Sequence, residues 1–109
     1  MKIIKIQYDD EFEDEGLYTI TFWVDKEPPR YISLARDEEE SPSIIYVELF
    51  DQKYGYETKN VTYKFKENLL NLYLDKDFAF LDNHHHIQIF INDADMFKVK
   101  QKLELIFDV

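Results

Sequence analysis

Residues 87–107, IQIFINDADMFKVKQKLELIF, change their hydrophobic period midway, and this change decides the fold class. In the first half every second residue is an isoleucine, so Ile87, Ile89 and Ile91 share one face, as in a strand that is buried on one side. From Asp95 onward the apolar residues recur at spacings of three and four, which is typical of an amphipathic helix. The stretch therefore predicts a last strand followed by a C-terminal helix.

The predicted helix has one apolar stripe and a row of lysines. We expect the buried stripe to consist of Met96, Val99, Leu103 and Ile106. We expect the lysines to lie toward the other face, at Lys98, Lys100 and Lys102. Asn92 or Asp93 can cap the first turn.

Upstream of this stretch the sequence predicts short strands joined by polar connections. The expected strands are residues 2–8, 17–24, 31–36, 44–50, 57–66 and 70–74. Two connections are strongly acidic, residues 9–16 and 37–43, and a single helical turn is expected around Phe78–Leu81. Most connections are too short for parallel crossovers. We therefore predict an α+β fold, a mainly antiparallel sheet of six or seven strands with the helix packed on one face.

The totals limit the function classes. The 109 residues have the length of one domain, residues 1–109, with 23 acidic and 13 basic residues and a net charge of −10. A nucleic-acid backbone requires clustered Lys and Arg, so the charge favours a basic protein partner over nucleic acid, unless it serves solubility alone. The chain has no cysteine, no leader-like start and no long apolar run. We expect a cytoplasmic protein without disulfides or membrane contact.

The residue inventory argues against an enzyme. No serine lies in a glycine elbow, and two glycines are too few for a phosphate-binding loop. Acidic pairs such as Asp9 and Asp10 stand in polar runs, whereas acid–base catalysis needs two carboxylates in different environments. We expect no catalytic residue and no cofactor.

The histidine tract 84–86 is the strongest candidate for a metal site. His84 and His86 could share one face of a strand and bind zinc or nickel together with Asp82. An exposed loop that leads into a strand explains the tract equally simply. Catalytic zinc sites usually take ligands from elements that are distant in sequence, so we expect no metal site here.

The segment Asp51-Gln-Lys-Tyr-Gly-Tyr56 follows an alternating strand and contains one of the two glycines. We predict a turn in which Gly55 adopts a positive φ that other residues resist. Tyr54 and Tyr56 either shield the edge of the hairpin or serve as rigid contact residues on an exposed rim.

Residues 46–74, YVELFDQKYGYETKNVTYKFKENLLNLYL, resemble the central block of immunity protein family 10 of bacterial polymorphic-toxin systems. The matching positions are Asp51, Gln52, Tyr54, Gly55, Val61, Leu70, Leu72 and Leu74. Residues 87–107 resemble the closing strand and helix of that family, so the similarity covers about residues 44–107. Gly55 stands alone where the family is richer in glycine. The resemblance implies a non-enzymatic cytoplasmic protein that binds and blocks a cognate toxin domain.

We predict two groups of partner-binding residues. The first is the aromatic segment, Asp51, Gln52, Tyr54, Gly55 and Tyr56, and the second is the acidic pair of loops, Asp9, Asp10, Glu11, Glu38, Glu39 and Glu40. Many toxin domains are basic because they attack nucleic acid, so the loops should speed association while the tyrosines slow dissociation. The alternative function is a non-enzymatic interaction or structural module without a toxin partner. The sequence distinguishes neither a monomer from a homodimer nor one toxin from another.

Overall fold

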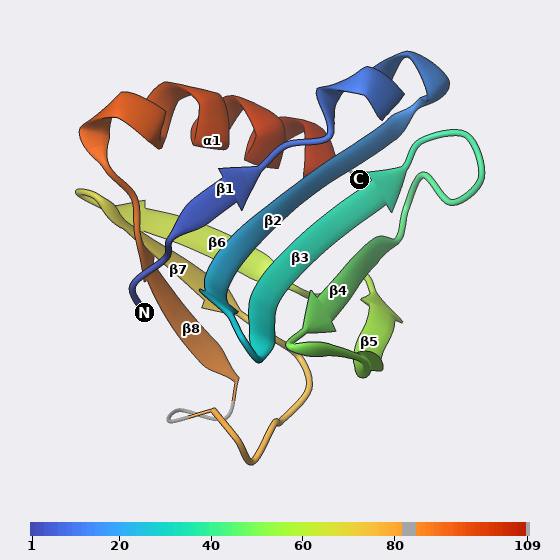
Figure 1. Ribbon diagram of the computed structural model, residues 1–109. Coiled ribbons are helices and arrows are strands. Elements are labelled where there is room, and N and C mark those ends of the chain that lie inside the picture. Colours follow the sequence, from blue (N-terminus) through green and yellow to red (C-terminus); the bar gives the residue numbers. More distant parts are fainter. Residues whose placement is uncertain (82–84, 109) are drawn as a thin grey trace.

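The computed structural model describes residues 1–81 and 85–108, in which eight strands form two antiparallel sheets and a helix ends the chain (Figure 1). The five-stranded sheet has the order β1 (Lys5–Gln7), β2 (Leu17–Lys26), β3 (Pro29–Asp37), β4 (Ile45–Leu49) and β5 (Asp51–Thr58). The three-stranded sheet has the order β6 (Thr62–Lys66), β7 (Leu69–Tyr73) and β8 (His86–Phe90). The helices are a 3₁₀ helix, η1 (Asp10–Glu15), and α1 (Asp93–Ile106). The predicted α+β fold is confirmed.

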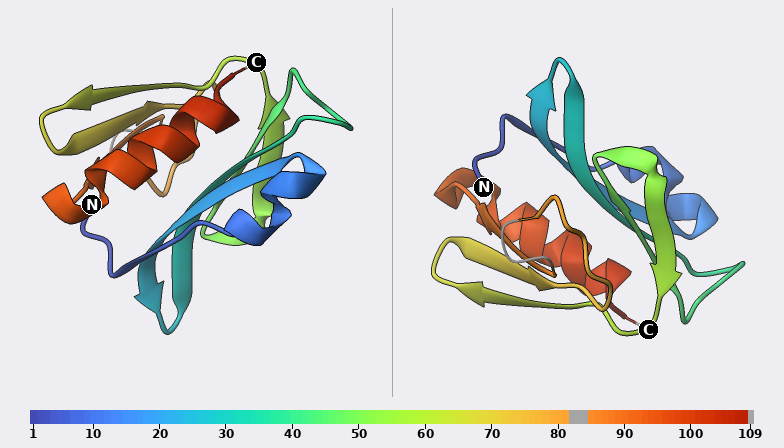
Figure 2. Two further views of the ribbon diagram at one scale, coloured as in Figure 1. Left: turned by 90° about the horizontal axis from the view of Figure 1, so that it is seen from above. Right: turned by 90° about the horizontal axis from the view of Figure 1, so that it is seen from below.

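The two sheets and α1 enclose one hydrophobic core. Phe22, Leu34 and Val47 of the larger sheet are fully buried, as are Leu72 and Ile89 of the smaller one. Seen from above, α1 lies between the two sheets and covers the space that separates them (Figure 2). Each sheet therefore buries one face and presents the alternate residues of its strands on the other.

The helix buries the stripe that the sequence predicts. Val99, Leu103 and Ile106 are fully buried, and Met96 is partly buried against the same core. Asn92 is the N-cap residue, and its carbonyl accepts the Asp95 N–H at 2.9 Å. Among the described residues, no helix has the length and apolar character needed to cross a membrane.

The C-terminal end of α1 is held by an arginine from β3. Arg36 is buried, and its guanidinium donates to the carbonyl of Leu105 at 2.6 Å and to that of Ile106 at 3.1 Å. The same guanidinium lies over the Tyr18 ring, 5.3 Å from its centroid. The last turn of α1 has no basic residue of its own, so Arg36 supplies the positive charge that a helix C-terminus favours.

The segment after β4 departs from the predicted boundaries. Residues 51–56, predicted as a turn, belong to β5, and the bend lies at Phe50, whose φ is 67°. The predicted strand 57–66 is divided, because the chain leaves the larger sheet after Thr58 and starts the smaller one at Thr62. Both halves alternate in the same way, so hydrophobic period alone could not show which sheet each half joins.

Three further segments test the sequence predictions. The turn at 66–68 is confirmed: Lys66 pairs with Leu69 around Glu67, whose φ is 54°. A single turn also forms where predicted, with the Leu81 N–H bonded to the Phe78 carbonyl at 3.0 Å. The first strand is shorter than the expected 2–8, and Ile4 is 54% exposed.

Replacing Leu103 by alanine should lower the free energy of unfolding by about 2–5 kcal/mol, because the side chain is fully buried among residues of both sheets. Phe97 on the same helix is 79% exposed, so Phe97→Ala is a matched control that should change stability by less than about 0.5 kcal/mol. Urea unfolding followed by Trp23 fluorescence measures both. Equal effects of the two substitutions would show that α1 is packed through a different face.

Candidate functional site

Folding brings the two acidic segments together. The Glu38 N–H donates to the Gly16 carbonyl at 2.8 Å, which joins the end of η1 to the loop after β3. Gly16 has a φ of 83°, and a Cβ on it would lie 3.2 Å from Glu39 Cγ, so both its conformation and its surroundings favour glycine. We call residues 9–15 and 37–40 the acidic end of the molecule.

Two carboxylates of the acidic end hold a buried lysine. Lys102 is 3% exposed, and its ammonium group binds Asp10 at 2.8 Å, Glu13 at 2.6 Å and the Tyr8 carbonyl at 3.0 Å. Lys98 reaches Asp10 at 2.9 Å. The prediction that Lys102 lies on the exposed face of the helix is wrong, because η1 packs beside α1 and supplies the carboxylates that compensate its burial.

These contacts change the acid–base properties of the pair. Hydrogen bonds from Lys102 and Lys98 lower the pKa of Asp10. Burial disfavours the charged form of Lys102, but the hydrogen bonds to Asp10 and Glu13 outweigh it, and the pKa of Lys102 is raised. Both groups are therefore charged at neutral pH, and Asp10 has a structural role besides any role in partner binding.

Other carboxylates of the acidic end bind within the loops. Asp9 accepts from the Gln7 side-chain amide at 2.8 Å, and Glu38 accepts from the Tyr18 hydroxyl at 2.9 Å. Asp37 accepts the backbone N–H groups of Glu39 and Glu40, both at 3.1 Å. Five exposed residues of the acidic end have neither a cation nor a side-chain partner in the part of the chain that the structure describes: Glu11, Asp14, Glu15, Glu39 and Glu40. These five remain available to a partner.

The larger sheet has a second surface of interest on the side opposite the core. Among the described residues, no helix or strand lies in front of β2, β3 and β4 in the view of Figure 1. Its side chains form one row of contacts across four strands: Trp23 donates to Gln7 at 3.0 Å, and its ring lies 5.2 Å from that of Tyr31. Tyr31 and Tyr46 both donate to Glu48, Tyr46 at 2.6 Å. We call this surface the outer sheet face.

Two hollows extend the outer sheet face at its ends. A hollow of about 250 Å³ connects it to the acidic end, lined by Leu17, Ala35, Asp37, Ser41, Ile44, Tyr46 and Glu57. A groove of about 350 Å³ lies at the other end, lined by Ile4, Lys5, Gln7, Trp23, Lys26 and Pro29. The acidic end and the outer sheet face are therefore one continuous surface. Part of the outer sheet face could be predicted from the sequence, because Thr19, Thr21 and Trp23 alternate with the core residues of their strand.

The role predicted for Gly55 is wrong. Its φ is not positive; the positive value in this region belongs to Phe50. A Cβ on Gly55 would overlap the hydroxyl of Tyr46, and it would lie 2.8 Å from Tyr46 Cζ and 3.1 Å from the Gln52 carbonyl oxygen. Glycine is required because the Tyr46 ring crosses the backbone of β5 at this point.

Tyr54 and Tyr56 are partly buried rather than placed at the tip of a turn. The Tyr54 ring lies 4.7 Å from that of Phe80, and the Tyr56 ring lies 5.8 Å from that of Phe78. The Tyr56 hydroxyl donates to Asp75 at 3.0 Å, and burial together with this bond raises the pKa of Tyr56. The two tyrosines thus pack β5 against residues 75–81, and their role in partner binding remains a prediction.

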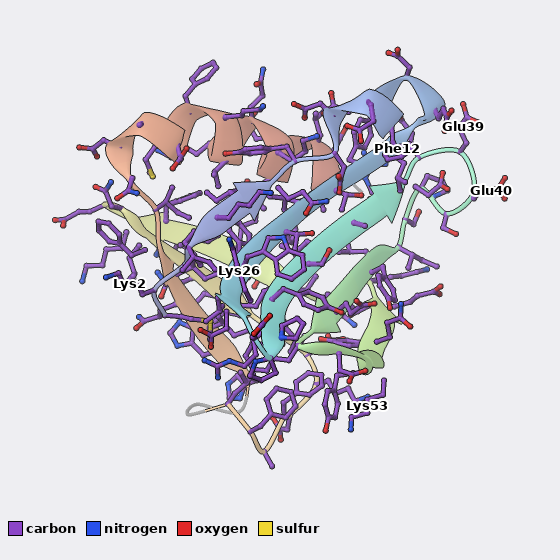
Figure 3. The ribbon with its side chains drawn as sticks, viewed as in Figure 1. Lys2, Phe12, Lys26, Glu39, Glu40 and Lys53 are labelled. Carbon is purple, nitrogen blue, oxygen red and sulfur yellow. The ribbon has the colours of Figure 1, made fainter. Side chains whose placement is uncertain are left out.

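The two predicted groups of partner-binding residues lie apart. Asp51 and Gln52 are exposed at the start of β5. Figure 3 places their neighbour Lys53 at one end of the molecule and Glu39 and Glu40 at the other. The structure therefore joins the two acidic loops to each other but does not join them to the aromatic segment.

The candidate metal site is only partly described, because Asp82 and His84 lie outside the described residues. His85 is exposed, with Nδ1 3.5 Å from Asp77, whereas His86 Nε2 lies 2.9 Å from Asn71 Oδ1. The His86 ring also stacks on the Tyr73 ring, with 4.6 Å between the ring centroids. Within residues 1–81 and 85–108, no three His, Cys, Asp or Glu side chains gather as a metal site. That the tract binds no metal remains a prediction.

Replacing Gly55 by alanine should destabilise the protein by about 1–3 kcal/mol, because the new methyl group must displace the Tyr46 ring. In a Tyr46→Ala background the same substitution should cost much less, since most of the overlap is gone. A double-mutant cycle of urea unfolding measures this coupling. Equal costs in both backgrounds would show that backbone conformation, not space, selects the glycine.

The pH dependence of the free energy of unfolding should show how much Lys102 contributes to stability. The pKa of Asp10 is lowered in the folded state from its ordinary 3.8, so its bonds stabilise the protein above that pH and are lost as the pH falls through the lowered value. Lys102→Met should therefore reduce stability at neutral pH and flatten its fall below about pH 4. Lys100→Met removes an exposed lysine of the same helix and should leave the acid profile unchanged. Urea unfolding at a series of pH values tests this, and parallel profiles of the protein and Lys102→Met would contradict it.

Comparisons with protein-family models, with curated proteins and with solved structures found no match for this chain. The resemblance of residues 46–74 and 87–107 to immunity protein family 10 therefore stands as a prediction.

Proposed function

We propose that the protein is a binding inhibitor, an immunity protein that recognises and neutralises a basic toxin domain in the cytoplasm. The observation that carries this proposal is the joining of two acidic segments, distant in sequence, into one end that continues onto the open outer sheet face. The acidic end of this surface provides a negative electrostatic field that attracts a basic partner, and the outer sheet face provides an area for contact with it.

The acidic end supports the first half of this function, which is fast capture of a basic partner. Five of its acidic residues are exposed and have neither a cation nor a side-chain partner among the described residues. Charges on one side of a molecule act over about 8–10 Å at physiological salt and raise the rate of association with an oppositely charged partner. The ion pairs of Lys102 with Asp10 and Glu13 hold η1 against α1, and the hydrogen bond from Glu38 to Gly16 holds the second acidic loop beside η1.

The outer sheet face supports the second half, which is retention of the partner. Trp23, Tyr31 and Tyr46 are held by contacts with their neighbours; the first two are partly buried and Tyr46 is exposed. Rings whose conformation is already fixed lose little entropy on binding, which is why Trp and Tyr are enriched at interfaces. We propose no catalytic activity and no cofactor; Asp10 and Glu13, two carboxylates that folding brings to one point, are both engaged by Lys102.

A general protein-interaction or structural module without a toxin partner is the second candidate. The same observation favours it, because an acidic end and an aromatic sheet face require only that the partner be basic. The two candidates differ in one outcome: an immunity protein protects cells that express the toxin encoded beside its gene, and a general module does not.

Replacing Glu11, Glu39 and Glu40 by glutamine should slow association with that toxin domain by about tenfold at low salt and flatten the salt dependence of the rate. The matched control replaces three exposed glutamates outside the acidic end, Glu27, Glu67 and Glu104, and so changes the net charge equally. Surface-plasmon kinetics at two salt concentrations measure both variants.

The same variants should be tested for protection of cells on co-expression with the toxin. Equal slowing by the control would mean that net charge, not the acidic end, steers the encounter. Absence of both binding and protection would overturn the immunity function in favour of the general module.

A further inference from the structure

Glu48 lies on the outer sheet face and accepts hydrogen bonds from two tyrosines of that face. It lies in β4 directly opposite Ser33 of β3, and it is only partly buried. The Tyr31 hydroxyl donates to its Oε2 atom, and the Tyr46 hydroxyl donates to its Oε1 atom at 2.6 Å. Each carboxylate oxygen thus receives one tyrosine, and the two rings flank the group.

This arrangement leaves the carboxylate able to bind a further donor. An ionised carboxylate offers about four acceptor positions, and two of them are used here. The hydrogen bond to Glu48 and burial raise the pKa of Tyr46 to about 12, and burial together with Glu48 raises that of Tyr31. Both hydroxyls therefore remain donors at neutral pH. One acceptor position is left on each oxygen, and a guanidinium group that binds with two parallel bonds needs one position on each oxygen.

In the part of the chain that the structure describes, no cation lies within 4 Å of Glu48. Arg30, on the neighbouring strand, binds Asp25 at 2.6 Å and lies over the Phe50 ring. A partly buried carboxylate usually acquires a counter-ion, because removing its charge from water is costly. Among the described residues, Glu48 therefore has two neutral hydroxyl donors and no counter-ion, so that a partner molecule can supply the positive charge.

We infer that Glu48, Tyr31 and Tyr46 form a receptor for one arginine side chain of the basic partner. This inference rests on the proposed function and names the contact through which the sheet face recognises that partner. A planar guanidinium fits better than a lysine ammonium, since it can bind both oxygens of Glu48 and stack on a tyrosine ring. Gly55 belongs to this receptor indirectly, because the absence of a Cβ lets the Tyr46 ring reach Glu48.

The receptor can be tested without the partner. N-acetyl-arginine amide, titrated into ¹⁵N-labelled protein, should shift the backbone amides of β3 and β4 around Ser33 and Glu48, with saturation in the millimolar range. N-acetyl-lysine amide should bind at least about threefold more weakly, as expected if one of two parallel bonds is lost. Glu48→Gln should weaken arginine binding about tenfold, whereas Glu104→Gln, at an exposed glutamate of α1, should leave it unchanged. The spectrum of each variant also reports whether it is folded.

Shifts centred on the acidic end, or shifts that persist in folded Glu48→Gln, would overturn the receptor. With the toxin domain, Glu48→Gln should speed dissociation about tenfold and leave the association rate unchanged, the opposite of the acidic-end variant. The two proposals fail separately. Arginine binding at Glu48 without protection of cells would overturn the immunity function alone, and protection without arginine binding at Glu48 would overturn the receptor alone.

Discussion

The buried ammonium group of Lys102 is the contact on which the arrangement of the acidic end depends. It joins Asp10 and Glu13 of η1 to α1, across nearly the whole length of the sequence. Without this cation a segment with six carboxylates in seven residues would repel itself and would have no reason to pack against the core. The lysine thus converts a self-repelling segment into a fixed element, and it leaves the outward carboxylates of that element unpaired.

Arg36 holds the helix less than one turn further along, at its C-terminal end. Its guanidinium binds the carbonyls of Leu105 and Ile106, so that α1 is attached to β3 by hydrogen bonds as well as by apolar packing. Two buried cations therefore position the helix in a protein whose net charge is −10. At the surface, Lys98 is paired with Asp10, and Figure 3 places Lys2, Lys26 and Lys53 away from Glu39 and Glu40.

The alternation of strands produces the second surface. Because the core takes every second residue of β2, β3 and β4, the remaining residues must form a face of their own. Register then places Tyr31 and Tyr46 on either side of Glu48, although they come from different strands. The acidic end and this face meet at a hollow beside Asp37 and Tyr46. One partner can therefore be attracted by the charges of the acidic end and bind to the aromatic rings of the outer sheet face.

The sequence by itself determined the α+β class, the burial of Val99, Leu103 and Ile106, and the acidic character of two connections, because hydrophobic period and local charge are properties of neighbouring residues. Only the tertiary structure decided where Lys102 points, why residue 55 is glycine, and where the chain passes from one sheet to the other. Each of these depends on a group that is distant in sequence: the carboxylates of η1, the ring of Tyr46, and the pairing partners of Thr58 and Thr62. Local pattern contains no information about such partners, since strands with the same alternation can pair in either sheet.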